Sequence, residues 1–151
     1  MTDAPARVHI VPVDADNWRA VARLEVLPDQ ERFIAATTYY LALCTYGGTW
    51  KPLAVKENGE VVGFLMWGFD PEEDAAWLGG IVIDRRHQGR GLGRAATREA
   101  MRMLHDTQGH TSFALSYQPE NVSAKRTYAS LGFVETGEVE DGEVVARTSL
   151  A

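Results

Sequence analysis

The feature that most restricts the fold is a nearly continuous run of nine apolar residues, Ala75–Ile83, in the middle of the chain. A strand with one face in water alternates polar and apolar residues, so this run predicts a strand that is covered on both faces. A glycine-rich turn follows it, and then come apolar residues at helical spacing, which are Leu92, Ala96, Ala100, Met103 and Leu104. A buried strand joined to an amphipathic helix is typical of an α/β protein.

Two hairpins are marked by their turns. Asn58-Gly59 and Asp141-Gly142 each stand between β-prone runs, and the two turn residues of such a hairpin need a positive φ, which these residue types tolerate. The runs that they join are Leu53–Val55 with Val61–Trp67, and Phe133–Val139 with Val144–Leu150. Single strands are expected at Val8–Val13, which alternates, and at Ser112–Tyr117.

The other helices are expected to start at residues that favour a helix N-terminus, namely Asp14 or Asp16, Pro28, and Asn121 or Ser123. The one that starts at Pro28 should continue through Cys44 and end at Gly47-Gly48. The resulting order is β-α-α-β-β-β-α-β-α-β-β. It describes an α/β fold with a mixed (α+β) sheet in a single domain, residues 1–151.

Composition and charge exclude several classes of protein. A formal net charge of −6 is the opposite of the basic face of a nucleic-acid binder, so no nucleic-acid partner is expected. The four histidines share no metal-ligand spacing and Cys44 is the single cysteine, so neither a metal site nor an internal disulfide is expected. No apolar segment is long enough for a membrane span, and Met1–Arg7 lacks the pattern of a secretion signal, which together predict a cytoplasmic protein.

An anion-binding turn is indicated where the buried strand meets its helix. Residues Gln88–Gly93 include three glycines, which allow a pyrophosphate to approach the backbone, and a helix start offers unpaired N–H groups and a positive dipole end. A turn that binds nothing would not explain the local cluster of Arg85, Arg86, Arg90 and Arg94 in an acidic chain. The glycine spacing matches neither the dinucleotide fingerprint nor the P-loop.

With these residues the chain resembles the GNAT superfamily of acyl-CoA N-acyltransferases. Its signature, Gln/Arg-x-x-Gly-x-Gly/Ala, is matched in full by residues 88–93. A second signature, Asn-x-x-Ala-x-x-x-Tyr-x-x-x-Gly-Phe, is matched by Asn121, Ala124, Tyr128, Gly132 and Phe133. The two signatures lie at family spacing, so the resemblance implies a GNAT-like fold, acetyl-CoA as cosubstrate and a small-molecule amine as acceptor.

The resemblance also implies roles for particular residues. The backbone of Ile81, Val82 and Ile83 should pair with the pantetheine arm like an added strand. The pyrophosphate should bind the backbone amides of Gln88, Gly89, Arg90, Gly91, Leu92, Gly93 and Arg94. Asn121 should contact the arm, and Tyr128 should face the thioester sulfur as the general acid.

The chemistry needs a neutral amine. A lysine-like amine has a reference pKa of about 10.4, so a proton must leave before the nitrogen attacks the thioester. The sequence does not identify the general base. It is either a chain of water molecules or one of six carboxylates, which are Glu25, Asp29, Glu31, Glu73, Asp74 and Glu143. Tyr128 has a second interpretation as a core aromatic, because it shares a helical face with Ala124 and Leu131. No motif places a histidine beside Cys44, which is therefore interpreted as a small buried apolar residue.

The acceptor is suggested by a closer resemblance, to the bacterial spermine/spermidine (diamine) acetyltransferase subgroup. It is carried by Gln30-x-x-Phe33-Ile34-Ala35, Ser116-Tyr117-x-Pro119-x-Asn121 and Gly142-Glu143-Val144, whereas Thr37 and Tyr40 replace the Asn and Ser of the subgroup. The acidic loop Glu72-Glu73-Asp74 suits a polycation. Acetylation of protein N-termini, lysines or an aminoglycoside-like amine stays open, as does a non-catalytic acetyl-CoA-binding regulatory domain. A homodimer is compatible with the family.

Overall fold

The structure is a computed structural model that describes residues 7–150. The sequence predicted no secretion signal in Met1–Arg7, and residues 1–6 of that segment lie outside the described residues. The strands are β1 (His9–Pro12), β2 (Lys51–Glu57), β3 (Glu60–Asp70), β4 (Ala75–Ile83), β5 (Ser112–Tyr117), β6 (Val134–Glu140) and β7 (Glu143–Ser149). The helices are α1 (Trp18–Ala22), α2 (Thr37–Tyr46), α3 (Leu92–Gln108) and α4 (Val122–Ser130), with 3₁₀ turns η1 (Pro28–Gln30) and η2 (Arg85–His87). The expected element order is confirmed.

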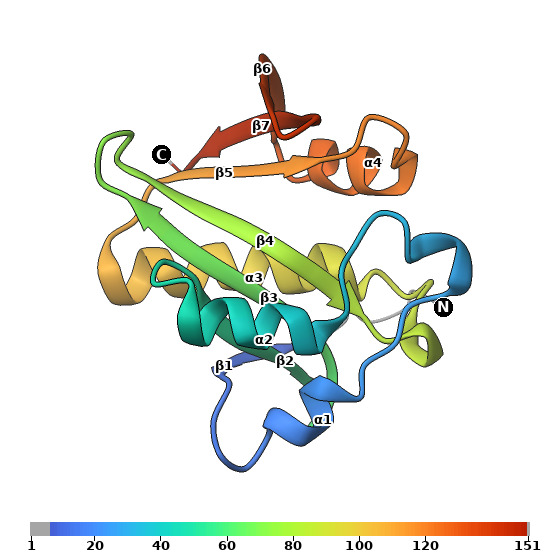
Figure 1. The fold of residues 1–151 in the computed structure, drawn as a ribbon. Helices are drawn as coiled ribbons and strands as arrows, with labels where there is room; N and C mark the ends of the chain where they lie inside the picture. Colours follow the sequence, from blue (N-terminus) through green and yellow to red (C-terminus); the bar gives the residue numbers. More distant parts are fainter. Residues whose placement is uncertain (1–6, 151) are drawn as a thin grey trace, which may run out of the picture.

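Residues 7–150 form one seven-stranded mixed sheet in the order β1-β2-β3-β4-β5-β7-β6. Neighbouring strands are antiparallel except β4 and β5, which are parallel and connected by α3. In the described part of the chain, β4 and β5 pair only at Ala76↔Phe113 and Trp77↔Ala114. Beyond these pairs the two strands diverge, as Figure 1 shows, and the edge of β4 that faces β5 is left without a partner strand.

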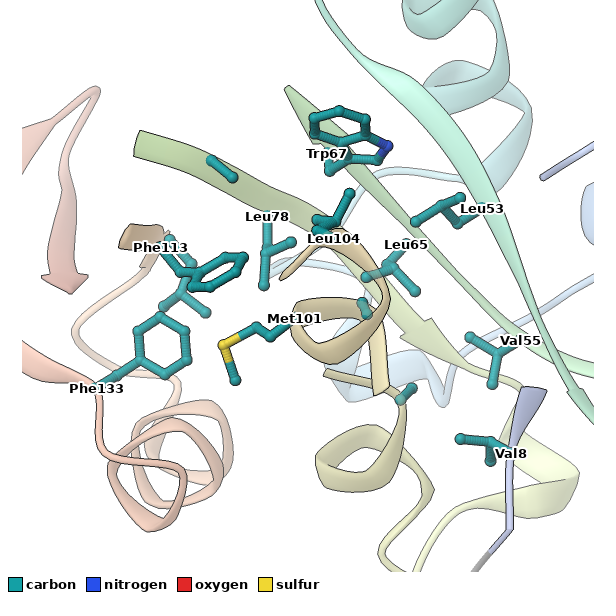
Figure 2. Packing of buried hydrophobic residues seen from close by; sticks show 14 of the residues in the cluster. Val8, Leu53, Val55, Leu65, Trp67, Leu78, Met101, Leu104, Phe113 and Phe133 are labelled. Atoms are coloured by element: carbon teal, nitrogen blue, oxygen red, sulfur yellow. The ribbon is translucent and has the colours of Figure 1, made fainter. Parts of the chain in front are cut away.

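Both faces of the sheet are covered, with α2 in front of it and α3 behind it in the view of Figure 1. The core beneath α3 contains the fully buried side chains of Leu65, Leu104 and Phe113, and Figure 2 shows Met101 beside Phe113 and Phe133. A second core on the α1 and α2 side is built on Val21, Phe64 and Val82, among others. Burial of each such side chain contributes about 1.5–3 kcal/mol. Because β4 supplies residues to both cores, its sequence is apolar throughout.

The two predicted hairpin turns are confirmed by their backbone angles. Asn58 and Asp141 each have φ of 49°, and the glycines that follow them, Gly59 and Gly142, have φ of 79° and 82°. Two successive residues with positive φ match the right-handed twist of the strands they connect.

The prediction of one helix from Pro28 to Cys44 is wrong. Only η1 and α2 are helical, and Ala36, which caps α2, is extended, with ψ of 146°. Two tertiary hydrogen bonds stabilise the break: the Thr37 hydroxyl donates to the Val21 carbonyl (2.9 Å), and the Ala35 amide donates to the Tyr40 hydroxyl (3.0 Å). These contacts join segments whose proximity the local spacing of apolar residues does not reveal.

Candidate functional site

A cavity of about 1020 Å³ lies where β4 and β5 diverge. Its lining includes Tyr40 and Met66 from the core on the α2 side, and Leu92 and Tyr128 from the core on the α3 side. The cavity therefore passes through the sheet, and it connects the two faces of the molecule where β4 and β5 separate.

The glycine-rich turn opens into this cavity. Gly89 and Gly91 have φ of 82° and 74°, and Gly91 is the residue that caps α3. A Cβ added to either glycine would meet no atom within 4 Å, so the glycines serve the backbone conformation and leave open space beside it. The first N–H groups of α3 have no partner within the helix, so this turn suits the oxygens of a pyrophosphate.

The side chain of Gln88 anchors the turn. Its Nε2 donates to the Ile83 carbonyl and to Gln30 Oε1, both at 2.9 Å, and Gln30 Nε2 donates in return to Gln88 Oε1. Gln30 is in η1, so this amide pair joins the turn to both the end of β4 and the segment before α2. Sequence reasoning assigned only the backbone of Gln88 to the site.

Asp84 is a second anchor, which sequence reasoning missed. Its side chain is buried, and it accepts hydrogen bonds from the amides of Glu25 (3.0 Å) and Arg86 (3.2 Å) and from Arg86 Nε (2.9 Å). Burial alone would raise the pKa of this carboxyl, but the hydrogen bonds from Glu25 and Arg86 together lower it below its ordinary value. The only local signal is a lone acidic residue directly after an apolar strand.

The arginine cluster does not act as one group. The side chains of Arg85, Arg86 and Arg90 form ion pairs with Glu25, Asp84 and Glu57, respectively. Arg94 instead donates from Nε to Ser130 Oγ (2.9 Å) and lines the cavity. Arg94 is therefore the member of the cluster whose charge faces the site.

A bulge bends β4 beside the cavity. The register with β3 shifts by one residue between Met66↔Gly79 and Phe64↔Val82, and Gly80 has φ of 58°. A Cβ on Gly80 would lie 3.3 Å from both the Phe64 and the Tyr40 rings, which leaves little room for a side chain. The bulge precedes Ile81–Ile83, whose outer edge lines the cavity and faces no strand. The Ile83 carbonyl accepts from Gln88 Nε2, and the other backbone groups on this edge have no strand to pair with, so an extended ligand can pair with them.

Helix α4 brings two residues to the cavity, Asn121 at its N-cap and Tyr128 in its last turn. Asn121 caps the helix, with Oδ1 accepting from the Ala124 amide (3.2 Å). The Tyr128 ring packs against Tyr117 and Phe133, with centroid distances of 5.8 and 6.1 Å. Burial, with a smaller contribution from Tyr117, raises the pKa of the Tyr128 hydroxyl, so it carries its proton at neutral pH. The hydrogen bonds within residues 7–150 include none from this hydroxyl, so its proton is available to a ligand.

The hydroxyl of Tyr117, beside Tyr128, already has a hydrogen-bond partner. It donates to Glu135 Oε1 (2.8 Å), and burial together with this carboxylate raises the pKa of Tyr117 to about 12. Of the two neighbouring phenols, Tyr128 is the one whose proton is not already used.

The six candidate bases differ in whether they line the cavity. Glu25 and Glu73 form ion pairs with Arg85 and Arg147, and the cavity lining includes neither of them. Asp29, Glu31 and Asp74 are also absent from this lining, although Glu31 borders a smaller cavity of about 470 Å³. Glu143 lines the main cavity, where its Oε1 accepts from Ser116 Oγ (2.8 Å).

Two residues noted in the sequence are also placed. Thr37 is buried and bonds to the Val21 carbonyl, whereas Tyr40 lines the cavity and stacks on Phe64. Cys44 packs beside Met66, and burial raises its pKa to about 11, so it stays a thiol and behaves as the expected small apolar residue.

Residues 7–150 contain no group of three or more His, Cys, Asp or Glu side chains that could hold a metal ion. No helix within the same range has both the length and the apolar character that a membrane crossing demands.

Comparison with known proteins agrees with this geometry. Residues 14–133 match the acetyltransferase (GNAT) family. The chain is 32% identical over 145 residues to a spermine/spermidine N(1)-acetyltransferase of Bacillus subtilis (strain 168), which covers 91% of this chain and 95% of that protein.

Solved structures show the same fold. An aminoglycoside acetyltransferase, AAC(6')-Ib, in complex with coenzyme A superposes with a TM-score of 0.76 at 17% identity, covering 95% of each chain. A spermidine N-acetyltransferase from Vibrio cholerae in complex with CoA and spermine gives a TM-score of 0.72 at 16% identity, covering 93% of this chain and 92% of that one.

Proposed function

The chain belongs to the acetyltransferase (GNAT) family of acyl-CoA-dependent N-acetyltransferases, and we propose that its acceptor is a primary amine of a small polyamine or diamine. The relative from Bacillus subtilis, whose name gives spermine and spermidine, supports this acceptor because the two chains align over nearly their whole length. The observation that carries the proposal is that the glycine-rich turn, the free edge of β4 and Tyr128 all line one cavity that passes through the sheet.

The turn and β4 bind the acetyl-CoA cosubstrate in this proposal. Backbone amides from Gln88 to Arg94 bind the pyrophosphate at the positive end of α3, and the Arg94 side chain adds its charge. The backbone of Ile81–Ile83 pairs with the pantetheine arm as an added strand would. Asn121 contacts the arm through its amide NH₂ group, because its oxygen already caps α4.

Tyr128 serves the transfer itself. The neutral amine nitrogen forms a bond to the thioester carbonyl carbon, the carbon–sulfur bond breaks, and the amine loses its extra proton to water. The departing sulfur accepts the proton of the Tyr128 hydroxyl, which then regains a proton from solvent. Burial raises the pKa of Tyr128, which keeps its hydroxyl protonated until the sulfur departs. Apolar surroundings also disfavour a negative charge on the departing sulfur, which favours transfer of the proton to it.

A product assay tests the proposal. The protein is incubated with acetyl-CoA and, in separate reactions, with spermidine, spermine, a lysine peptide, a peptide with a free N-terminus or an aminoglycoside. The release of free thiol is measured, and the masses of the products are determined by mass spectrometry. We expect thiol release matched by one added acetyl group on the polyamines. Binding of acetyl-CoA without thiol release for any amine would instead identify a non-catalytic binding domain.

The cytoplasmic location and the homodimer that the sequence suggested stay predictions. A single cysteine whose thiol is partly buried is compatible with a reducing compartment.

A further inference from the structure

Glu143 is the first residue of β7 and lies partly buried in the wall of the cavity. The hydroxyl of Ser116 donates to its Oε1 at 2.8 Å. Ser116 belongs to the part of β5 beyond the last pair with β4, so this hydrogen bond fixes the carboxylate beside the opening between the two strands.

The charge of Glu143 has no counterion in the described chain. No Arg, Lys or His nitrogen within residues 7–150 forms an ion pair with it, whereas other carboxylates near the site do have such partners, among them Glu25, Glu57, Glu73 and Glu135. Two arginines, Arg94 and Arg126, line the cavity, but neither pairs with Glu143. A partly buried carboxylate without a cation is costly, and a cationic ligand would relieve that cost.

Aromatic side chains also line the cavity. Tyr40 of α2 lies there with its hydroxyl fixed by the Ala35 amide, and Tyr39 meets its ring edge-on at 6.0 Å. The charge of Glu143 contributes to the raised pKa of Tyr40, after the larger effect of burial, so the two groups interact across the space between them. A carboxylate facing aromatic rings is a favourable environment for an ammonium group.

Glu143 and Tyr128 serve different faces of the sheet. Side chains alternate along a strand, and Tyr117 packs into the core on the α3 side with Tyr128, so its neighbour Ser116 is directed to the α2 side. The glycine-rich turn begins α3. An anionic cosubstrate therefore finds positive groups on the α3 side, and a cationic acceptor finds Glu143 on the α2 side.

We propose that Glu143, oriented by Ser116, binds the ammonium group of the acceptor that does not react, and so sets a preference for amines with a second cationic nitrogen. This inference rests on the proposed function and assigns no proton transfer to Glu143. The reacting amine reaches the thioester through the opening between β4 and β5, while the rest of the acceptor stays on the α2 side.

The test compares Glu143→Gln with the wild type on two acceptors, spermidine and n-butylamine, which lacks a second nitrogen. The substitution keeps the size of the side chain and its acceptor for Ser116. We expect kcat/KM for spermidine to fall about 10- to 100-fold, mainly through KM, because a charge-assisted contact is lost. We expect kcat/KM for n-butylamine and the KM for acetyl-CoA to stay within about twofold.

Two variants serve as controls. Glu72→Gln removes the same charge from the exposed β3–β4 loop, outside the cavity lining, and should behave as wild type with both amines. Glu143→Asp keeps the charge and should retain more spermidine activity than Glu143→Gln. Melting temperatures close to that of the wild type would show that the variants are folded.

Three outcomes would overturn the inference. An unchanged KM for spermidine in Glu143→Gln would show that the carboxylate does not bind the acceptor. An equal loss with both amines would place Glu143 in the transfer step or in the structure instead. A wild type that does not acetylate spermidine would remove the inference together with the proposed function, whereas the first two outcomes leave that function intact.

Discussion

Tyr128 shows how one side chain can be both core and catalyst. Its ring packs against Tyr117 and Phe133, as expected of a core aromatic, while the residue also lines the cavity. The two roles separate cleanly in Tyr128→Phe, because phenylalanine keeps the ring and removes only the proton donor.

We expect Tyr128→Phe to lower kcat by about 10²- to 10⁴-fold, the usual contribution of a positioned acid. Acetyl-CoA affinity, measured by calorimetry, and the melting temperature should hardly change. A pure packing role predicts nearly normal turnover, and a binding role predicts weaker affinity or a raised KM. Near-wild-type kcat with the transfer step rate-limiting would contradict the general-acid assignment.

Asp84 stabilises the turn through its ionised form. Its folded-state pKa is lower than the unfolded value, which is about 3.9, so its contribution is complete above pH 3.9 and is lost as the pH falls through the folded-state value. In Asp84→Asn, the amide NH₂ would face donors from Arg86.

We expect Asp84→Asn to lower the free energy of unfolding at pH 7 by about 1–3 kcal/mol, since buried donors lose their partner. Denaturant titrations of the two proteins should show a stability difference that narrows once the pH falls below about 3.9 and that disappears only below the folded-state pKa of Asp84. A stability difference that stays constant between pH 7 and pH 3 would exclude a contribution from the carboxylate charge.

At the scale of elements, the glycine-rich turn and α3 form the cosubstrate site, and Gly91 at the cap of α3 tests it. Gly91→Asn and Gly91→Asp place side chains of nearly equal size at a positive φ that Asn and Asp tolerate better than other residues do. The two variants should therefore fold equally well, and they differ mainly in a negative charge beside the expected diphosphate.

We expect calorimetry to show acetyl-CoA affinity reduced in Gly91→Asn and reduced by about a further tenfold or more in Gly91→Asp, because like charges repel in a partly desolvated site. Equal affinity for the two folded variants would mean that the pyrophosphate does not lie at this turn.

The elements that local sequence signals define were predicted well. The apolar run of β4 and the positive-φ turn pairs each depend on neighbouring residues alone. The break before α2 was not predicted, because it depends on Thr37 reaching Val21 and on Tyr40 meeting Ala35. Apolar periodicity continues through that break and gives no sign of it.

The residues of the site likewise fall into those that sequence motifs predict and those that only the fold brings together. The glycine-rich turn, Asn121 and Tyr128 could be found from motifs, and they line the cavity with the exception of Arg90, which pairs with Glu57. The partners of the arginines and the pairing of Ser116 with Glu143 could not, because each joins residues that are distant in the sequence. Which of six carboxylates faces the cavity is likewise decided by the fold.

At the scale of the whole molecule, the separation of β4 from β5 is the central feature. It joins the positive turn on the α3 side to the acidic and aromatic wall on the α2 side through one cavity. A net charge of −6 also attracts a polycationic acceptor over long distances. It attracts a peptide of low charge less strongly. The acidic loop Glu72-Glu73-Asp74 lies outside the cavity lining, so its contribution is limited to this general attraction.

The most direct test of the account is a competition between acceptors. Limiting acetyl-CoA is supplied to the enzyme with equal concentrations of spermidine and a lysine peptide, and the ratio of acetylated products gives the ratio of kcat/KM values. The account predicts that acetylspermidine exceeds acetylated peptide at least tenfold. An excess of acetylated peptide would contradict the polyamine acceptor while leaving the acetyltransferase fold and its cosubstrate turn in place.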